Sequence, residues 1–132
     1  MEKIKIILVD DHHLFRDEIK DLLSDSDDIV IIGEASDGKE LFTKIENLQP
    51  DIIIMDISLH GMSGIEITKK LYMDHPDIKV LILSKYYNEE FVLNSQKAGA
   101  RGFLPKTSSG NEILEAIHSI KNGNVFFTQA IE

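Results

Sequence analysis

The sequence contains no cysteine, and its 23 aspartate and glutamate residues outnumber its 14 lysine and arginine residues. Without cysteine the chain forms neither a disulfide framework nor a thiolate zinc site, which suits a reducing compartment. The net charge of −9 would repel the phosphate backbone of nucleic acids and the surface of an anionic membrane. We therefore expect no direct binding of this chain to DNA, RNA or membranes.

Several signatures of targeting segments and enzymes are also missing. The first residues lead only into a short apolar run followed by acidic residues, which fits neither a signal peptide nor a membrane span. There is no G-x-G-x-x-G for a dinucleotide and no G-x-S-x-G for a hydrolase. Residues 33–40 nearly match a phosphate-binding loop, but Glu40 stands where that loop needs a magnesium-binding hydroxyl. We expect a cytoplasmic protein that does not bind nucleotides at this loop.

What the sequence does contain is a series of short apolar runs without polar alternation, typical of strands buried on both faces of a parallel sheet. The runs are Ile4 to Val9, Ile29 to Ile32, Ile52 to Met55, Val80 to Leu83 and, more weakly, Gly102 to Leu104. Segments with helical spacing alternate with them, including Ser63 to Asp74 and Asn88 to Ala98. This pattern predicts one α/β domain, a doubly wound (βα)5, flavodoxin-like three-layer sandwich with parallel strand order 2-1-3-4-5.

Polar residues end or follow four of the expected strands. Asp10 and Asp11 follow the first, Asp56 the third, and Ser84 and Lys106 the fourth and fifth, whereas the second is expected to end at Gly33 without a matching group. In such sheets ligands bind beyond the carboxyl ends of the strands, where strand order reverses. Three carboxylates there repel one another, and their hard oxygens favour Mg²⁺.

An aspartate beside a divalent cation, a lysine and a hydroxyl is a candidate nucleophile for phosphoryl transfer. Taken singly, each residue has a more ordinary reading, because Asp10 or Asp11 could cap the following helix and Ser84 could simply end a strand. Their convergence at the ends of four strands favours the chemical reading. His12 and His13 beside two aspartates could imitate a transition-metal site, but adjacent histidines at a helix start more often face solvent.

Five short motifs contain these residues: Val9-Asp10-Asp11-His12, Ile54-Met55-Asp56, Gly61-Met62-Ser63-Gly64, Leu83-Ser84 and Gly102-Phe103-Leu104-Pro105-Lys106. Together they resemble the receiver domain of bacterial two-component response regulators, over about Lys3 to Gly123. Residues 14–16, 33–35 and 98–100 look like the NarL/FixJ-type subfamily, whose members usually carry a C-terminal LuxR-type helix-turn-helix domain. We assign residues 1–123 to the receiver domain and 124–132 to a C-terminal tail or the start of an interdomain linker, although Val125, Phe126 and Phe127 could dock on the core.

The resemblance implies a phosphorylated aspartate at Asp56, with a phosphohistidine on a sensor histidine kinase, or a small acyl phosphate, as the donor. It implies Mg²⁺, with Mn²⁺ possible in its place. The ion would be bound directly by Asp11, mainly through water by Asp10, and also by Asp56 and the backbone carbonyl of Ser58. The chain would phosphorylate and dephosphorylate itself without being a turnover enzyme. A phosphatase that uses an aspartyl phosphate usually needs a second aspartate at the position of Ser58.

The resemblance further implies that Ser84 and Lys106 contact phosphoryl oxygens, that Ser84 and Phe103 form the conformational switch, and that Ser58 and Tyr86 influence phosphoryl lifetime. Phosphorylation would favour a homodimer and control transcription, with DNA reached only through the missing output domain. The alternative is a receiver-like protein-interaction module that dimerises without phosphorylation.

Three positions depart from the common pattern. Phe103 stands where tyrosine is common, and without a hydroxyl group any switching there must rest on packing alone. His60 stands where the family usually has proline, so we expect a more mobile loop after Asp56. Thr107 follows Lys106 where many members have a cis proline, so we expect no cis bond here.

Overall fold

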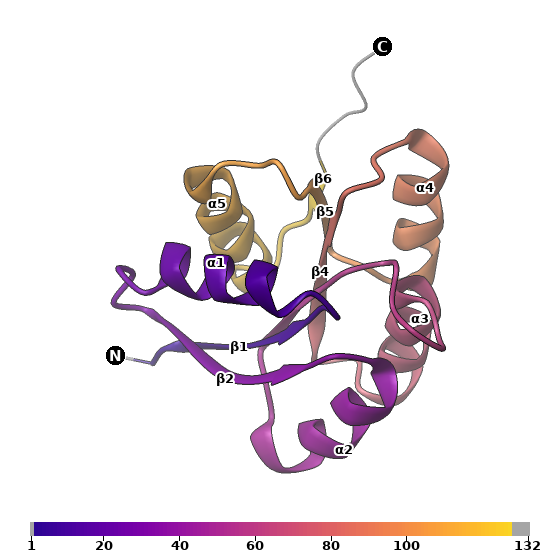
Figure 1. Ribbon diagram of the computed structural model, residues 1–132, viewed down its shortest axis with the longest axis horizontal. Coiled ribbons are helices and arrows are strands. Elements are labelled where there is room, and N and C mark those ends of the chain that lie inside the picture. Colours follow the sequence, from indigo (N-terminus) through magenta and orange to yellow (C-terminus); the bar gives the residue numbers. More distant parts are fainter. Residues whose placement is uncertain (1, 128–132) are drawn as a thin grey trace.

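The computed structural model describes residues 2–127, in which strands and helices alternate along the chain (Figure 1). The strands are β1 (Ile4–Val9), β2 (Ile29–Ala35), β3 (Ile52–Met55), β4 (Lys79–Ser84), β5 (Gly102–Pro105) and β6 (Phe126–Phe127). The helices are α1 (His13–Leu23), α2 (Gly38–Leu48), α3 (Gly64–Asp74), α4 (Glu89–Ala98) and α5 (Gly110–Lys121). None of these helices has the length and apolar character that a membrane span requires.

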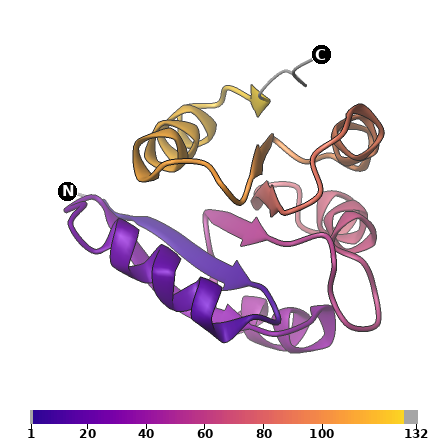
Figure 2. The same ribbon diagram turned by 45° about the horizontal axis from the view of Figure 1, so that its top comes forward.

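The strands form a single parallel sheet in the order β2-β1-β3-β4-β5-β6. The predicted order 2-1-3-4-5 is confirmed, and strand order reverses between β1 and β3. Helices α1 and α5 cover one face of the sheet, whereas α2, α3 and α4 cover the other (Figures 1 and 2). The result is the predicted three-layer sandwich.

Two apolar cores explain why the strand sequences lack polar alternation. Ile6 and Leu8 of β1 belong to the core under α1 and α5, and Ile7 and Val9 belong to the core on the opposite face. All four side chains are almost completely buried. Since both faces of the sheet are covered, apolar residues at successive positions all lose their contact with water.

The sixth strand lies in the segment that we expected to be a tail or linker. Phe126 pairs with Gly102 and Phe127 with Phe103, and the N–H of Phe126 donates to the carbonyl of Arg101 at 2.8 Å. Phe126 packs against the core beneath α1 and α5, and Phe127 packs against the other core. The expected docking is confirmed for Phe126 and Phe127, which pack on opposite faces of the sheet. It is wrong for Val125, which is exposed.

Side-chain caps fix the starts of four helices, and α3 and α4 begin one residue inside the segments predicted from the sequence. The side chains of Asp37, Ser63, Asn88 and Ser109 accept hydrogen bonds from backbone N–H groups in the first turns of α2, α3, α4 and α5. Such bonds satisfy donors that have no partner within the helix. Helix α1 differs, because its N-cap His12 makes no side-chain capping bond. The residues before α1 are therefore held in another way.

Candidate functional site

Backbone hydrogen bonds hold the residues that follow the strands at one edge of the sheet. The N–H of Asp56 donates to the carbonyl of Val9 at 3.0 Å, and the N–H of Lys106 donates to the carbonyl of Ser84 at 2.9 Å. Each bond extends a strand pairing by one residue. The carboxyl ends of β1, β3 and β5 therefore bring Asp10, Asp56 and Lys106 into one crevice, and Ser84 ends the neighbouring strand β4.

Lys106 lies between two carboxylates from different strands. Its Nζ is 2.7 Å from Oδ2 of Asp10 and 3.3 Å from Oδ2 of Asp56, and it lies 4.3 Å from the centre of the Phe15 ring. The side chain of Lys106 is 13% exposed, and those of Asp10 and Asp56 are 6% and 3% exposed. In such surroundings the attraction between these charges is only weakly screened.

The Asp56 carboxylate carries an unbalanced charge in this pocket. Burial raises the pKa of Asp56, the nearby charge of Lys106 lowers it, and the charge of Asp10 raises it further. Oδ1 of Asp56 is buried and has no hydrogen-bond partner among the described residues. A buried carboxylate oxygen without a partner is costly, so this atom is suited to accept a cation or to react.

The donor set fits a hard divalent cation. Ligand atoms of Asp10, Asp11, His12 and Asp56 all lie within 4.8 Å of one another. Carboxylate oxygens at such separations suit Mg²⁺ or Mn²⁺, which bind a few protein oxygens and keep several waters. The structure thus brings together the three predicted carboxylates, and their roles as ligands remain predictions. Ser58 is exposed in the loop after β3, and its carbonyl stays a predicted ligand.

The acidic pair at the end of β1 does not cap α1 in the usual manner. Oδ1 of Asp10 accepts a hydrogen bond from the N–H of His12 at 2.9 Å. The ring Nδ1 of His12 is 2.9 Å from Asp10 Oδ1 and 3.0 Å from Asp11 Oδ1, although the side chain is 56% exposed. His12 thus faces solvent, as expected, while its ring also contacts both carboxylates. His13 begins α1 and is exposed.

Comparison with known proteins assigns this architecture to a family. The profile of the response regulator receiver domain matches residues 6–118, which is most of the chain. The chain belongs to the response regulator receiver domain family. Proteins of this family are signalling proteins and not turnover enzymes. Solved NarL- and LuxR-type regulators are among the proteins to which this chain is similar.

Two curated relatives illustrate the similarity. The receiver domain is 34% identical over 124 residues to the transcriptional regulatory protein DegU of Brevibacillus brevis, covering 94% of this chain and 52% of that protein. It is 36% identical over 124 residues to the response regulator protein VraR of Staphylococcus aureus strain Mu3, covering 94% of this chain and 59% of that protein. The chain therefore spans little more than half the length of these relatives.

Solved structures confirm the fold. The signal receiver domain of the response regulator NarL from Mycobacterium tuberculosis matches with a TM-score of 0.89 at 31% identity, over 94% of this chain and 100% of that one. A LuxR-family two-component response regulator from Aurantimonas sp. SI85-9A1 matches with a TM-score of 0.90 at 30% identity, over 95% and 89% of the two chains. The flavodoxin-like receiver fold predicted from the motifs is thereby confirmed.

The predicted switch residues of the receiver domain occupy contrasting environments. Ser84 is fully buried, and its Oγ accepts a hydrogen bond from the N–H of Tyr86 at 3.1 Å. The Tyr86 side chain itself is exposed and lies beside Lys85, whose Nζ is 5.3 Å from the ring centre. Phe103 is fully buried, and the Tyr87 ring meets it edge-on with centroids 5.6 Å apart.

Two of the three departures from the family pattern, His60 and Thr107, lie on exposed loops of the receiver domain. His60 is exposed and lies in the loop between β3 and α3, whose mobility stays a prediction. Thr107 is also exposed, and the peptide bond that precedes it is trans, as expected.

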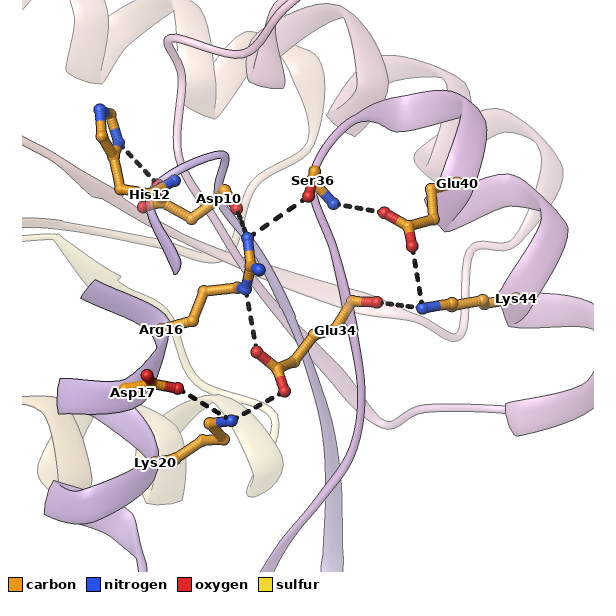
Figure 3. Close-up of polar contacts among 9 residues, drawn as sticks. All are labelled: Asp10, His12, Arg16, Asp17, Lys20, Glu34, Ser36, Glu40 and Lys44. Atoms are coloured by element: carbon orange, nitrogen blue, oxygen red, sulfur yellow. Dashed lines mark hydrogen bonds and ion pairs between the residues drawn. The ribbon is translucent and has the colours of Figure 1, made fainter. Parts of the chain in front are cut away.

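One expectation about β2 is wrong. The strand continues beyond Gly33 to Ala35, and Glu34 near its end contributes indirectly to the acidic edge through Arg16 of α1 (Figure 3). The guanidinium of Arg16 donates to Oε1 of Glu34 at 2.9 Å and to the backbone carbonyl of Asp10. Arg16 and Glu34 lie in the segments that suggested the subfamily, but no sequence rule pairs residues from a helix and an edge strand.

Proposed function

We propose that this receiver domain accepts a phosphoryl group on Asp56 in a Mg²⁺-dependent reaction, from a phosphohistidine of a sensor histidine kinase or from a small acyl phosphate. The observation that carries the proposal is the position of Lys106, 2.7 Å from Asp10 and 3.3 Å from Asp56 at the point where strand order reverses. A buried lysine beside two buried carboxylates supplies positive charge where a phosphoryl group would add negative charge.

In the proposed reaction an oxygen of Asp56 attacks phosphorus. The bond from phosphorus to the donor nitrogen or oxygen breaks, and its electron pair leaves on the donor. Oδ1 is the suited atom, because it has no partner among the described residues whereas Oδ2 contacts Lys106. The ammonium of Lys106 would then donate to a phosphoryl oxygen, and the Ser84 hydroxyl would donate to another.

A divalent cation would be held by the carboxylates of Asp10, Asp11 and Asp56 and by the backbone carbonyl of Ser58. When bound, Mg²⁺ or Mn²⁺ neutralises the anionic groups that phosphoryl transfer brings together. Asp10 and Asp56 also hold Lys106 in place. The same residues therefore orient both positive groups of the site.

Phosphorylation would act on the rest of the protein through Ser84 and Phe103. If the Ser84 hydroxyl turns toward the phosphoryl group, the β4–α4 loop moves with it, because the N–H of Tyr86 is bonded to Ser84 Oγ. Phe103 lies in the core on the α4 side and would repack with that loop. A shift from about 1:99 to 99:1 requires roughly 5.5 kcal/mol, which a few charge-assisted hydrogen bonds supply.

The output would be a homodimer favoured by phosphorylation in the cytoplasm. In a full-length regulator, DNA would be reached through a C-terminal LuxR-type helix-turn-helix domain. Tyr86 and Ser58 would set phosphoryl lifetime by restricting water, since Ser58 lies two residues after the acceptor and Tyr86 two residues after Ser84. We expect Tyr86→Ala to shorten the lifetime of the phosphorylated state, and an unchanged lifetime would remove this role.

Intact-mass spectrometry tests the acceptor. Incubation with Mg²⁺ and acetyl phosphate should add one phosphoryl group to the wild type and none to Asp56→Asn. Asp51→Asn is a matched control, because Asp51 lies just before the other end of β3, where it pairs with Lys121 at 3.3 Å. This control should be labelled like the wild type. Equal labelling of Asp56→Asn, or labelling that does not require Mg²⁺, would contradict the proposal.

Size measurement of the same samples tests the output. We expect phosphorylated wild type to dimerise and the unlabelled protein to remain smaller. A dimer of equal stability in wild type and Asp56→Asn, with or without acetyl phosphate, would support the alternative of an interaction module that needs no phosphorylation.

A further inference from the structure

Arg16 lies close to the crevice that contains Asp10, Asp11 and Asp56, but among the described contacts it touches none of their carboxylates. It lies in the first turns of α1, and its side chain is only 14% exposed. Nε donates to Oε1 of Glu34 at 2.9 Å, Nη1 donates to the backbone carbonyl of Asp10, and the Oγ of Ser36 lies 3.5 Å from Nη1 (Figure 3). A planar guanidinium with donors in a fixed fork suits this two-sided contact.

The backbone of Asp10 is therefore bonded to β2 through both its N–H and its C=O. Its N–H donates to the carbonyl of Ala35 at 3.0 Å, and its C=O is bonded through Arg16 to the adjacent Glu34. Because a peptide unit is planar, fixing the carbonyl of Asp10 also fixes the N–H and Cα of Asp11. One guanidinium thereby orients the peptide that joins two of the candidate metal ligands.

Glu34 has further basic partners besides Arg16. Lys20, which also contacts Asp17 at 3.1 Å, lies 2.9 Å from Glu34 Oε2, and Lys44 donates to the backbone carbonyl of Glu34 at 2.5 Å. The pKa of Glu34 is lowered, first by the hydrogen bond from Lys20 and then by Arg16. Ionised Glu34 balances the charge of Arg16, so this guanidinium does not compete with a cation for the site carboxylates.

We propose that Arg16 is a positioning residue for the acceptor pocket, which sets the orientation of Asp10 and Asp11 toward a divalent cation by holding the carbonyl between them. The inference rests on the proposed function. Arg16 touches neither the cation nor the phosphoryl group. Its effect passes through the Asp10–Asp11 peptide, and Glu34 serves as its anchor on β2.

The first test is the affinity of the unphosphorylated receiver domain for Mg²⁺ alone, measured by calorimetric titration. Arg16→Met should raise the Kd for Mg²⁺ about tenfold or more, as loss of an outer-shell partner typically does. Lys20→Met is the matched control, because it removes the other partner of Glu34 from the same helix without touching Asp10. Its Kd should stay within about twofold of wild type.

Thermal unfolding without Mg²⁺ separates positioning from stability. These unfolding curves define a temperature at which all variants are folded, and the titrations are made there. If Arg16 only stabilised the fold, Arg16→Met would then bind Mg²⁺ with the same affinity as Lys20→Met. That result would overturn the inference. If Arg16→Met does not fold, Arg16→Lys replaces it, since an ammonium keeps the charge but does not span Glu34 and Asp10 together. Arg16→Lys should likewise raise the Kd for Mg²⁺, and a Kd equal to that of Lys20→Met would overturn the inference.

Labelling by acetyl phosphate keeps the two proposals distinguishable. A wild type that neither binds Mg²⁺ nor labels on Asp56 would remove the proposed function and this inference with it. A wild type that does both, beside an Arg16→Met protein that binds Mg²⁺ as tightly as Lys20→Met, would remove the inference alone.

Discussion

Gly64 gives a specific prediction about how the backbone positions Asp56, the proposed phosphoryl acceptor. It begins α3, and a Cβ added there would lie 2.0 Å from the carbonyl oxygen of Asp56, and 2.9 Å from both the Asp56 carbonyl carbon and the Ile57 Cα. The N–H of Gly64 also donates to the carbonyl of Ile57 at 2.8 Å. All the crowded atoms belong to the backbone, so no side-chain rotation relieves the overlap of Gly64→Ala.

The size of the effect follows from this geometry. Carbon and oxygen normally approach no closer than about 3.3 Å, so α3 and the Asp56 carbonyl must separate by more than about 1 Å. Forced overpacking costs about 1–3 kcal/mol, and in a chain of this size each kcal/mol lowers Tm by roughly 4 °C. A displacement of about 1 Å at a reacting group slows the reaction roughly 100-fold.

Gly61→Ala is the control in the same loop. Gly61 has a φ of +84°, but a Cβ there would meet nothing within 4 Å. The substitution therefore carries only the cost of the left-handed conformation, about 1–2 kcal/mol, and leaves the Asp56 backbone in place. We expect Gly61→Ala to lose stability and still take up phosphoryl groups at nearly the wild-type rate, while Gly64→Ala loses both.

Thermal unfolding and the initial rate of labelling by acetyl phosphate measure the two effects separately. The reasoning would be refuted by a Gly64→Ala protein with wild-type Tm and labelling rate. It would also fail if Gly61→Ala and Gly64→Ala, compared at equal stability, lost labelling to the same extent.

Three further predictions concern charge and packing. Because burial raises the pKa of folded Asp56 above its unfolded value, Asp56→Asn should be more stable than wild type in EDTA near neutral pH, and Tm curves should converge as pH falls through the folded pKa. Lys106→Met leaves Asp10 and Asp56 without their cation and should cost about 3 kcal/mol in urea unfolding, part of which Mg²⁺ restores. Phe126→Ala should cost roughly 1–3 kcal/mol, whereas exposed Val125→Ala should cost almost nothing.

The strands were predictable because burial on both faces leaves a direct mark on the sequence. Ile6 and Ile7 contact different cores, so neighbouring residues on one strand are both apolar. The end of such a run then marks the carboxyl edge of the sheet, which is why Asp56, Ser84 and Lys106 could be expected in one crevice. Topology supplied the rest, since parallel strands with alternating helices allow few arrangements.

The edges of the sheet were less predictable, because strands there do not need to be apolar on both faces. On β2, the polar Glu34 ends the apolar run, although the strand continues because an edge position lets this carboxylate reach Arg16 and Lys20. Strand β6 has only two residues, Phe126 and Phe127, too few to show any period. Both features depend on contacts between distant segments, which the spacing of apolar residues along the sequence does not predict.

Burial also determines which of the carboxylates of Asp10, Asp11 and Asp56 pair with Lys106. Their chemistry is the same, yet Lys106 pairs with Asp10 and Asp56, whose side chains are 6% and 3% exposed, while Asp11 is 36% exposed. Attraction between charges grows as solvent is excluded, so the lysine is best stabilised by the two buried carboxylates. Asp11 is left facing water, the side from which a hydrated cation would arrive, shedding only part of its shell. A pocket with all three carboxylates equally buried would attract the lysine more strongly but would admit the cation less readily.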